Sequence, residues 1–129
     1  MRTVFVLLSL LLGVSGARAG ALVDAFSGHP VVVYTFYALQ PNCLPMPMSV
    51  IHLEPIAQPR HGHLLWANAM VPTRYPASNP RHVCNDVARH GLHLLYQANA
   101  GYKGSDNFTV QITFPAGATQ TVSRPVEVR

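Results

Sequence analysis

The clearest pattern in the chain is a strict alternation of apolar and polar residues over positions 107–114. The apolar positions are Phe108, Val110, Ile112 and Phe114, and the polar positions are Asn107, Thr109, Gln111 and Thr113. Because successive side chains of a strand point to opposite faces, this pattern predicts a half-buried antiparallel β-strand. A helix would instead place apolar residues three or four positions apart.

Five further segments carry strand-forming residues and are separated by turn residues: 31–39, 48–54, 63–67, 92–97 and 121–128. Segment 31–39 is apolar on both faces, which predicts a central, well-covered strand. Eleven prolines are spread along the chain and interrupt any long helical pattern. We therefore expect an all-β domain, an immunoglobulin-like antiparallel sandwich of six or seven strands, with Trp66 packed in its core.

Segments rich in proline, glycine and asparagine are predicted to connect these strands. Residues 55–60 and 99–106 are expected to be turns, and residues 41–47 a proline-rich loop that carries Cys43. Residues 71–90 form the longest irregular stretch and carry Cys84. Long loops on a rigid scaffold often perform recognition, so residues 71–90 are the first candidate for a binding loop.

The first 19 residues have the three parts of a secretory signal peptide. Arg2 supplies the positive start, residues 4–14 are almost continuously apolar, and Ala17-Arg18-Ala19 forms a small-x-small cleavage site. A membrane anchor is the alternative interpretation, but a spanning helix needs about 20 apolar residues. We expect a signal peptide over residues 1–19, one exported domain over residues 20–129, and no membrane span after cleavage.

Two cysteines, Cys43 and Cys84, remain in the expected mature domain. In an oxidising compartment an even number of cysteines favours pairing, so we expect one disulfide. Two free thiols or a metal site are the alternatives, although the close C-x-x-C spacing of zinc sites and redox enzymes is absent.

Charge and motif content argue against several classes of function. The formal net charge is +4, and removal of Arg2 and Arg18 with the signal peptide lowers it. The remaining basic residues are scattered and do not alternate with aromatic residues, so nucleic acid is not expected as a partner. The sequence contains no G-x-S-x-G or H-E-x-x-H motif, and its five acidic residues are few for paired-carboxylate catalysis. We predict no catalytic residue, no cofactor and no enzymatic activity.

Two motifs resemble a known group of domains. Residues 59–64 read P-R-H-G-H-L, and residues 95–110 read L-Y-Q-A-N-A-G-Y-K-G-S-D-N-F-T-V. They resemble the P-x-H-G-x-L and Y-x-P-N-x-G-Y-x-G-x-D-x-F-x-V segments of bacterial Ig-like and cadherin-like β-sandwich domains. The resemblance implies a sandwich fold and a role as a spacer, an adhesive module or an assembly part. Ala98 departs from the pattern, and the calcium-binding sequences of cadherin repeats are absent.

The motif residues also have a direct physical interpretation. Gly101 and Gly104 permit positive φ angles in the connection between two strands. Asp106 can accept hydrogen bonds from nearby backbone N–H groups and hold that turn. Tyr96, Tyr102 and Phe108 supply aromatic bulk to a thin core. The motif is therefore expected to build the fold, without performing chemistry.

Histidine and methionine suggest a second possible activity. His61 and His63 are two positions apart and would share one face of a strand, and Met46 and Met48 repeat that spacing. Imidazole and thioether ligands in an exported protein suit copper. The alternatives are that His61 belongs to the P-x-H-G motif and that the methionines cover the sandwich edge as adaptable apolar residues.

Three hypotheses follow from the sequence. The first is a non-catalytic, periplasmic or secreted module that acts in protein–protein interaction or as a structural element, with an unknown protein or cell-envelope component as its partner. The second is a periplasmic copper-binding protein that uses His61, His63, Met46 and Met48. The third is an enzyme that acts on the envelope.

Overall fold

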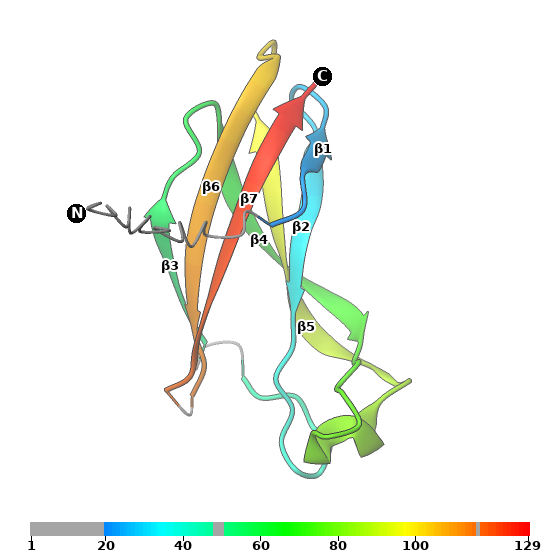
Figure 1. The fold of residues 1–129 in the computed structure, drawn as a ribbon. Helices are drawn as coiled ribbons and strands as arrows, with labels where there is room; N and C mark the ends of the chain where they lie inside the picture. The colour runs from blue at the N-terminus through cyan, green and yellow to red at the C-terminus, as the bar shows by residue number, and fades with distance from the viewer. Residues whose placement is uncertain (1–19, 48–50, 116) are drawn as a thin grey trace, which may run out of the picture.

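The computed structural model describes residues 20–47, 51–115 and 117–129, which fold as a seven-stranded β-sandwich (Figure 1). The strands are β1 (Val23–Ala25), β2 (Pro30–Phe36), β3 (His52–Ala57), β4 (Gly62–Pro72), β5 (Ala88–Ala98), β6 (Gly104–Thr113) and β7 (Thr119–Val128). A short 3₁₀ helix, η2 (Pro80–Cys84), lies between β4 and β5. The predicted signal peptide lies outside the described residues, and within them no helix is long and apolar enough to cross a membrane.

The strands form two sheets with the orders β1-β7-β6-β3 and β2-β5-β4. The second, fourth and fifth strands share one sheet and the third, sixth and seventh the other, which is the immunoglobulin-like division. This confirms the predicted fold class. The short first strand was not predicted, and it pairs in parallel with β7 while the other four strand pairings are antiparallel.

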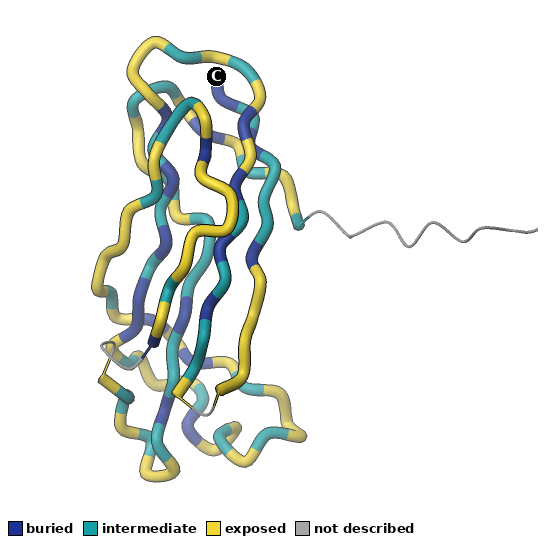
Figure 2. Tube along the Cα trace, turned by 90° about the vertical axis from the view of Figure 1, so that its left-hand side faces the viewer, coloured by how far each residue is buried: buried dark blue, intermediate teal, exposed yellow. Residues whose placement is uncertain are grey.

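The core lies between the two sheets and follows the predicted alternation. Phe108, Val110 and Ile112 of β6 are fully buried, and they face Leu94 and Tyr96 of β5 in one cluster. Figure 2 shows buried and more exposed positions alternating along the strands. Phe114, the last apolar residue of the predicted strand, lies beyond β6 and is only partly buried.

Edge strands account for three corrections to the sequence analysis. Segment 31–39 was expected to be central, but β2 ends at Phe36 and lies at the edge of its sheet. Residues 55–60 were expected to be a turn, but β3 continues through Pro55 to Ala57. Proline is tolerated there because an edge strand has one side without a ladder partner.

The third correction concerns Trp66, which was expected in the core and is 38% exposed. It lies on β4, the other edge of the three-stranded sheet, where no further strand covers it. Its ring contacts Phe36 with the ring centroids 5.9 Å apart. The Trp66 side chain therefore covers part of Phe36 at the edge of the sandwich.

The Asp106 carboxylate joins the two motifs noted in the sequence. Its oxygens accept hydrogen bonds from the backbone N–H groups of Arg60, His61 and Asn107 and from the hydroxyl of Tyr96 at 2.7 Å. Two of these donors lie about 45 positions away in the chain, so the role of Asp106 extends well beyond the local turn that was predicted. One buried carboxylate thus ties the start of β4 to both β5 and β6.

Close packing also stabilises the region where Asp106 joins the start of β4 to β5 and β6. A Cβ atom on Gly62 would lie 2.5 Å from the carbonyl oxygen of Gln97 and 2.9 Å from the ring of Tyr96, so only glycine fits. The His61 ring stacks on Tyr102 with the centroids 3.9 Å apart. Gly101 and Gly104 have positive φ angles, as the motif predicts. These residues build the fold.

Replacement of Asp106 by alanine is expected to destabilise the domain strongly. The buried hydroxyl of Tyr96 and the backbone N–H groups lose their acceptor, which costs on the order of 3 kcal/mol. Urea denaturation followed by Trp66 fluorescence measures the change. Ser105→Ala, which removes one exposed hydrogen bond beside it, is the control and should change stability by less than about 0.5 kcal/mol. Equal effects of the two substitutions would contradict the bridging role.

Asp106 should also make stability depend on pH. Burial raises the pKa of its carboxyl, but the hydrogen bonds from Tyr96, Arg60, Asn107 and His61 together outweigh burial and lower the pKa below the ordinary value of 3.8. A pKa that is lower in the folded state gives stability that is present above the unfolded pKa and lost as pH falls through it toward the folded pKa.

The stability difference between the wild type and Asp106→Asn should therefore shrink between about pH 6 and about pH 2. Urea midpoints of both proteins across this range give the measurement. The other four acidic residues are common to both proteins and cancel in the comparison. A difference that stays constant with pH would show that Asp106 does not contribute as an ionised group.

Candidate functional site

The Cys43–Cys84 disulfide ties together the irregular segments at one end of the sandwich, as predicted. The two Cα atoms are 5.4 Å apart, although 41 positions separate the cysteines in the chain. Cys43 lies in the loop after β2, and Cys84 ends η2. Both segments lie at the lower end of the molecule in Figure 1, which we call the disulfide end.

A second, small core lies beneath the disulfide. Leu39, Val71, Thr73 and Cys84 are all buried, and none of them belongs to the main cluster between the sheets. The hydroxyl of Thr73 donates a hydrogen bond to the carbonyl of Cys84 at 3.0 Å. The predicted loop 71–90 is therefore an ordered cap, with β4 ending at Pro72, η2 in its middle and β5 beginning at Ala88.

Side-chain hydrogen bonds hold this cap to the end of β2. The Asn85 amide exchanges two hydrogen bonds of 2.8 Å with the backbone of Tyr75. The Tyr75 hydroxyl accepts from the backbone N–H of Leu39, and the Tyr37 hydroxyl accepts from that of Arg74. Burial raises the pKa of Tyr75 above its ordinary value of 10.0, so its phenol stays neutral. Tyr37 and Tyr75 therefore lie at this end with their hydroxyl groups bound to the backbone of the neighbouring segment.

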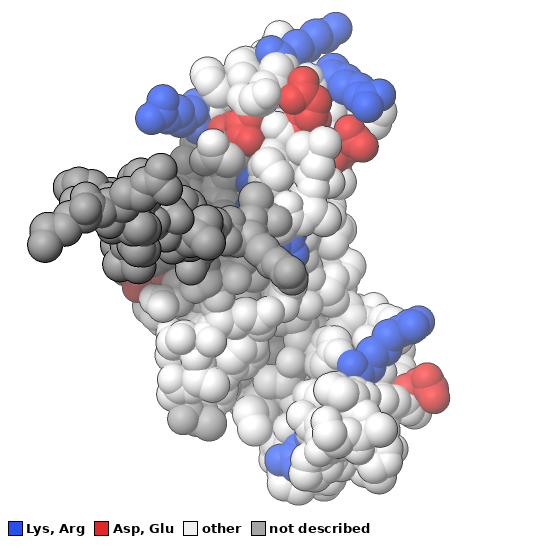
Figure 3. Space-filling model, in the orientation of Figure 1, with Lys and Arg blue, Asp and Glu red and all other residues white. Residues whose placement is uncertain are grey.

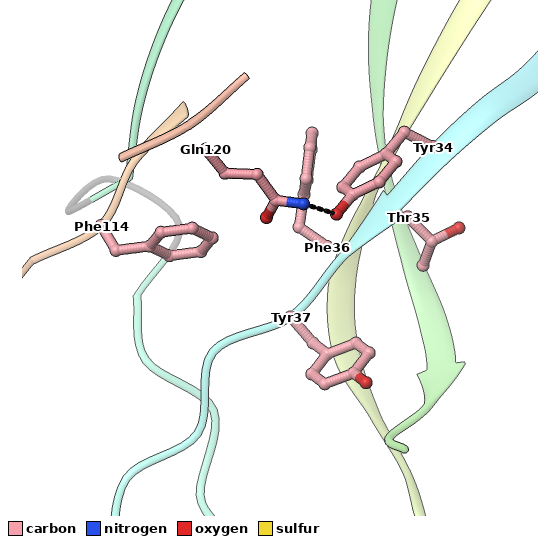
Figure 4. A pocket seen from close by; sticks show the side chains of 6 residues that line it. All are labelled: Tyr34, Thr35, Phe36, Tyr37, Phe114 and Gln120. Atoms are coloured by element: carbon pink, nitrogen blue, oxygen red, sulfur yellow. Dashed lines mark hydrogen bonds between the residues drawn. The ribbon is translucent and has the colours of Figure 1, made fainter. Parts of the chain in front are cut away.

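The first of two adjoining cavities opens between the sheets below β1, with a volume of about 200 Å³. Figure 4 shows Phe36 and Tyr37 of the β2 segment on one side and Phe114 on the other. The side-chain amide of Gln120 donates a hydrogen bond to the Tyr34 hydroxyl across the opening. The side chain of Thr35 points away from this cavity.

The second cavity, of about 510 Å³, lies between the end of β2 and the disulfide-tethered cap. Tyr37 and Phe114 line both cavities, so the two cavities lie next to each other. Tyr75 and Arg81 of the cap line its far side, and the rings of Tyr37 and Tyr75 meet edge to face at 5.2 Å. We call the two adjoining cavities together the aromatic groove. It is the candidate functional site.

Exposed apolar side chains also mark the disulfide end. Leu44 and Val83 each adjoin a disulfide cysteine, and Val87 and Met70 follow in the same region of the cap and of β4. All four side chains are about half exposed or more. Apolar groups gathered near a concave, aromatic surface are typical of a binding site.

The candidate copper ligands do not lie together. His63 pairs with Gln97 at the start of β4, and His61 precedes it, at the end of the sandwich opposite the disulfide. Met46 lies in the Cys43 loop at the disulfide end, and Met48 lies outside the described residues. Within the described ranges, no three His, Cys, Asp or Glu side chains are arranged to hold a metal ion.

A third cavity, lined by Arg60, His61, Ser105, Asp106 and Asn107, lies at that opposite end. Its carboxylate already accepts hydrogen bonds from Arg60, His61, Asn107 and Tyr96, so it is committed to the fold. We therefore assign this cavity a structural role.

The sequence analysis identified part of the groove and missed the rest. It selected residues 71–90, which supply Tyr75 and Arg81, but it assigned Tyr34 and Tyr37, which are only partly buried, to a covered strand. The proline-rich loop directly after these aromatic residues was the available signal, because a strand that ends in such a loop leaves its last side chains at the end of the sandwich.

Comparisons of the chain with protein-family models, curated proteins and solved structures found no match.

Loss of the disulfide should make the segments around the groove open at lower free energy than the strands of the sandwich. The chain-entropy model gives roughly 4 kcal/mol for a loop of this length, a large share of the stability of a small domain. For Cys43→Ala/Cys84→Ala, hydrogen exchange should show residues 37–47 and 73–87 losing protection first, while β6 stays protected until global unfolding. Loss of protection in β6 before the cap would contradict this placement of the constraint.

Proposed function

We propose that this domain is a non-catalytic recognition module that binds a partner protein or envelope component through its disulfide end. The observation that carries the proposal is the aromatic groove, whose two adjoining cavities lie between Tyr34 on β2 and Arg81 in the disulfide-tethered cap. Rigid aromatic side chains provide contact area at low conformational entropy cost, which makes them effective binding residues.

The composition of the groove favours binding over catalysis. Its described lining is aromatic, aliphatic and amide-bearing, with one arginine, and contains neither a carboxylate nor an imidazole. General acid–base chemistry most often uses such a group, placed within hydrogen-bond reach of the substrate. Burial raises the pKa of Tyr75, so its phenol is a poor general base near neutral pH.

Export to the periplasm or the medium is part of the same proposal. A disulfide that joins irregular segments persists in an oxidising compartment and is reduced in the cytosol. The pattern of residues 1–19 supports the same conclusion independently. A partner that meets this domain is therefore expected at or outside the cell envelope.

Site-specific photocrosslinking tests where the partner docks. A benzophenone amino acid at Val83, which is 70% exposed at the disulfide end, should form adducts in cells that export the protein. The matched control at Phe26, which is 61% exposed at the opposite end, should not form them. Phe114→Ser, which removes an aromatic wall of the groove, should reduce the Val83 adducts about tenfold.

Two outcomes of the crosslinking would contradict the proposal. Adducts formed from position 26 and absent from position 83 would place recognition at the other end. Adducts from position 83 that persist in full with Phe114→Ser would remove the groove from the contact. A thermal melt of each variant checks that the fold is retained.

A further inference from the structure

The disulfide end carries an excess of positive charge. Arg74, Arg81 and Arg89 lie in the cap and the first residues of β5, where Asp86 is the one acidic residue. Among the described residues the one salt bridge joins Arg129 to Asp24 at the opposite end. Figure 3 shows basic and acidic side chains mixed at the upper end, while basic side chains predominate at the lower end.

Two of these arginines are held in place by the backbone of the Cys43 segment. The Nε of Arg81 donates to the carbonyl of Leu39 at 3.2 Å, and the Nε of Arg89 donates to the carbonyl of Cys43 at 2.8 Å. The terminal nitrogens of Arg81 make no hydrogen bond within the described part of the chain. Arg81 thus lines the groove, and its terminal N–H donors are unused within the described residues.

Such an arginine is suited to a carboxylate. The planar guanidinium presents paired N–H donors that match the two oxygens of a carboxylate group. Because its Nε is already bound to the protein, little side-chain freedom remains to be lost when a ligand binds. The rings of Tyr37, Tyr75 and Phe114 lie in the same cavity and offer an apolar surface beside the charge.

We propose that the aromatic groove binds an acidic peptide segment of the partner. A carboxylate of the segment pairs with Arg81, and a neighbouring aromatic or aliphatic side chain packs between Tyr37, Tyr75 and Phe114. Arg74 and Arg89 add to the attraction through the field at this end. This inference rests on the proposed function and specifies the chemistry of the partner.

The surroundings of the groove favour a peptide over an acidic glycan. Leu44, Val83 and Val87 are exposed apolar side chains at the same end, and apolar peptide side chains would cover them. A polyuronate presents carboxylates and hydroxyl groups with little apolar surface to match them. Charge complementarity alone would suit either ligand, so the test includes both.

Selection from a random peptide display library against the folded, oxidised domain tests the proposal. The enriched peptides should carry Asp or Glu within a few positions of an aromatic or aliphatic residue. Arg81→Gln should weaken the best peptide by about tenfold or more, as expected for loss of a charge-assisted pair. Raising the NaCl concentration from about 0.05 M to about 0.5 M should weaken binding several-fold, because added salt screens the attraction.

Matched variants separate charge from folding. The Arg74 side chain makes no hydrogen bond within the described residues. Arg74→Gln therefore tests the contribution of positive charge at this end to binding, without removing a hydrogen bond of the fold. It should weaken binding by about threefold. Arg60→Gln at the opposite end removes a positive charge outside the groove and should leave affinity unchanged. Unchanged affinity in Arg74→Gln and Arg81→Gln, both folded by circular dichroism, would overturn the proposal.

The remaining outcomes distinguish this inference from the proposed function. Enrichment of neutral or basic peptides whose binding Phe114→Ser abolishes would overturn the acidic ligand and leave recognition at the groove intact. Binding to polygalacturonate, lost in Arg81→Gln, without peptide enrichment would assign the groove to an acidic glycan and overturn the peptide. Absence of any ligand sensitive to Phe114→Ser would count against both proposals.

Discussion

Two irregular segments at one end of this sandwich have little backbone pairing of their own, and the Cys43–Cys84 bond holds them against each other. Without that bond, a few turn hydrogen bonds, a few side-chain hydrogen bonds and the buried Leu39 and Thr73 would have to order the segment after β2 and the segment around η2. The covalent link removes much of the entropy cost of ordering them. The shape of the aromatic groove therefore depends on this single constraint.

Polar side chains have different roles at the two ends of the molecule. At the end opposite the disulfide, the Asp106 carboxylate and its four hydrogen-bond donors join β4, β5 and β6, so the polar chemistry there is used by the fold. At the disulfide end, the Arg81 guanidinium makes one hydrogen bond within the described residues and lines a cavity. A charged group whose hydrogen bonds are satisfied stabilises structure, whereas an oriented group with unused donors is available to a ligand.

Edge strands explain both the errors of the sequence analysis and the position of the groove. An apolar or aromatic residue on an edge strand has the same local pattern as one on a central strand, because periodicity reports which face is apolar and not which neighbours lie beside the strand. Trp66 and Tyr34 were assigned to covered positions for this reason, whereas Phe36 is buried as expected. Tyr34, Phe36 and Tyr37 line the groove because no strand continues β1 along this side of the sandwich.

The sequence by itself determined the all-β class, the alternating core of β6, the pairing of two cysteines and the glycine and aspartate positions of the motif. The strands and the motif positions follow from local sequence patterns. The disulfide follows from the number of cysteines, because each of the two has the other as its partner. Only the tertiary structure decided that Asp106 bonds to the backbone at residues 60 and 61, that His61 and Met46 lie at opposite ends, and that Tyr37, Tyr75, Arg81 and Phe114 share a cavity. These relationships join residues tens of positions apart. They depend on sheet order and on the path of the tethered cap, which side-chain periodicity does not encode.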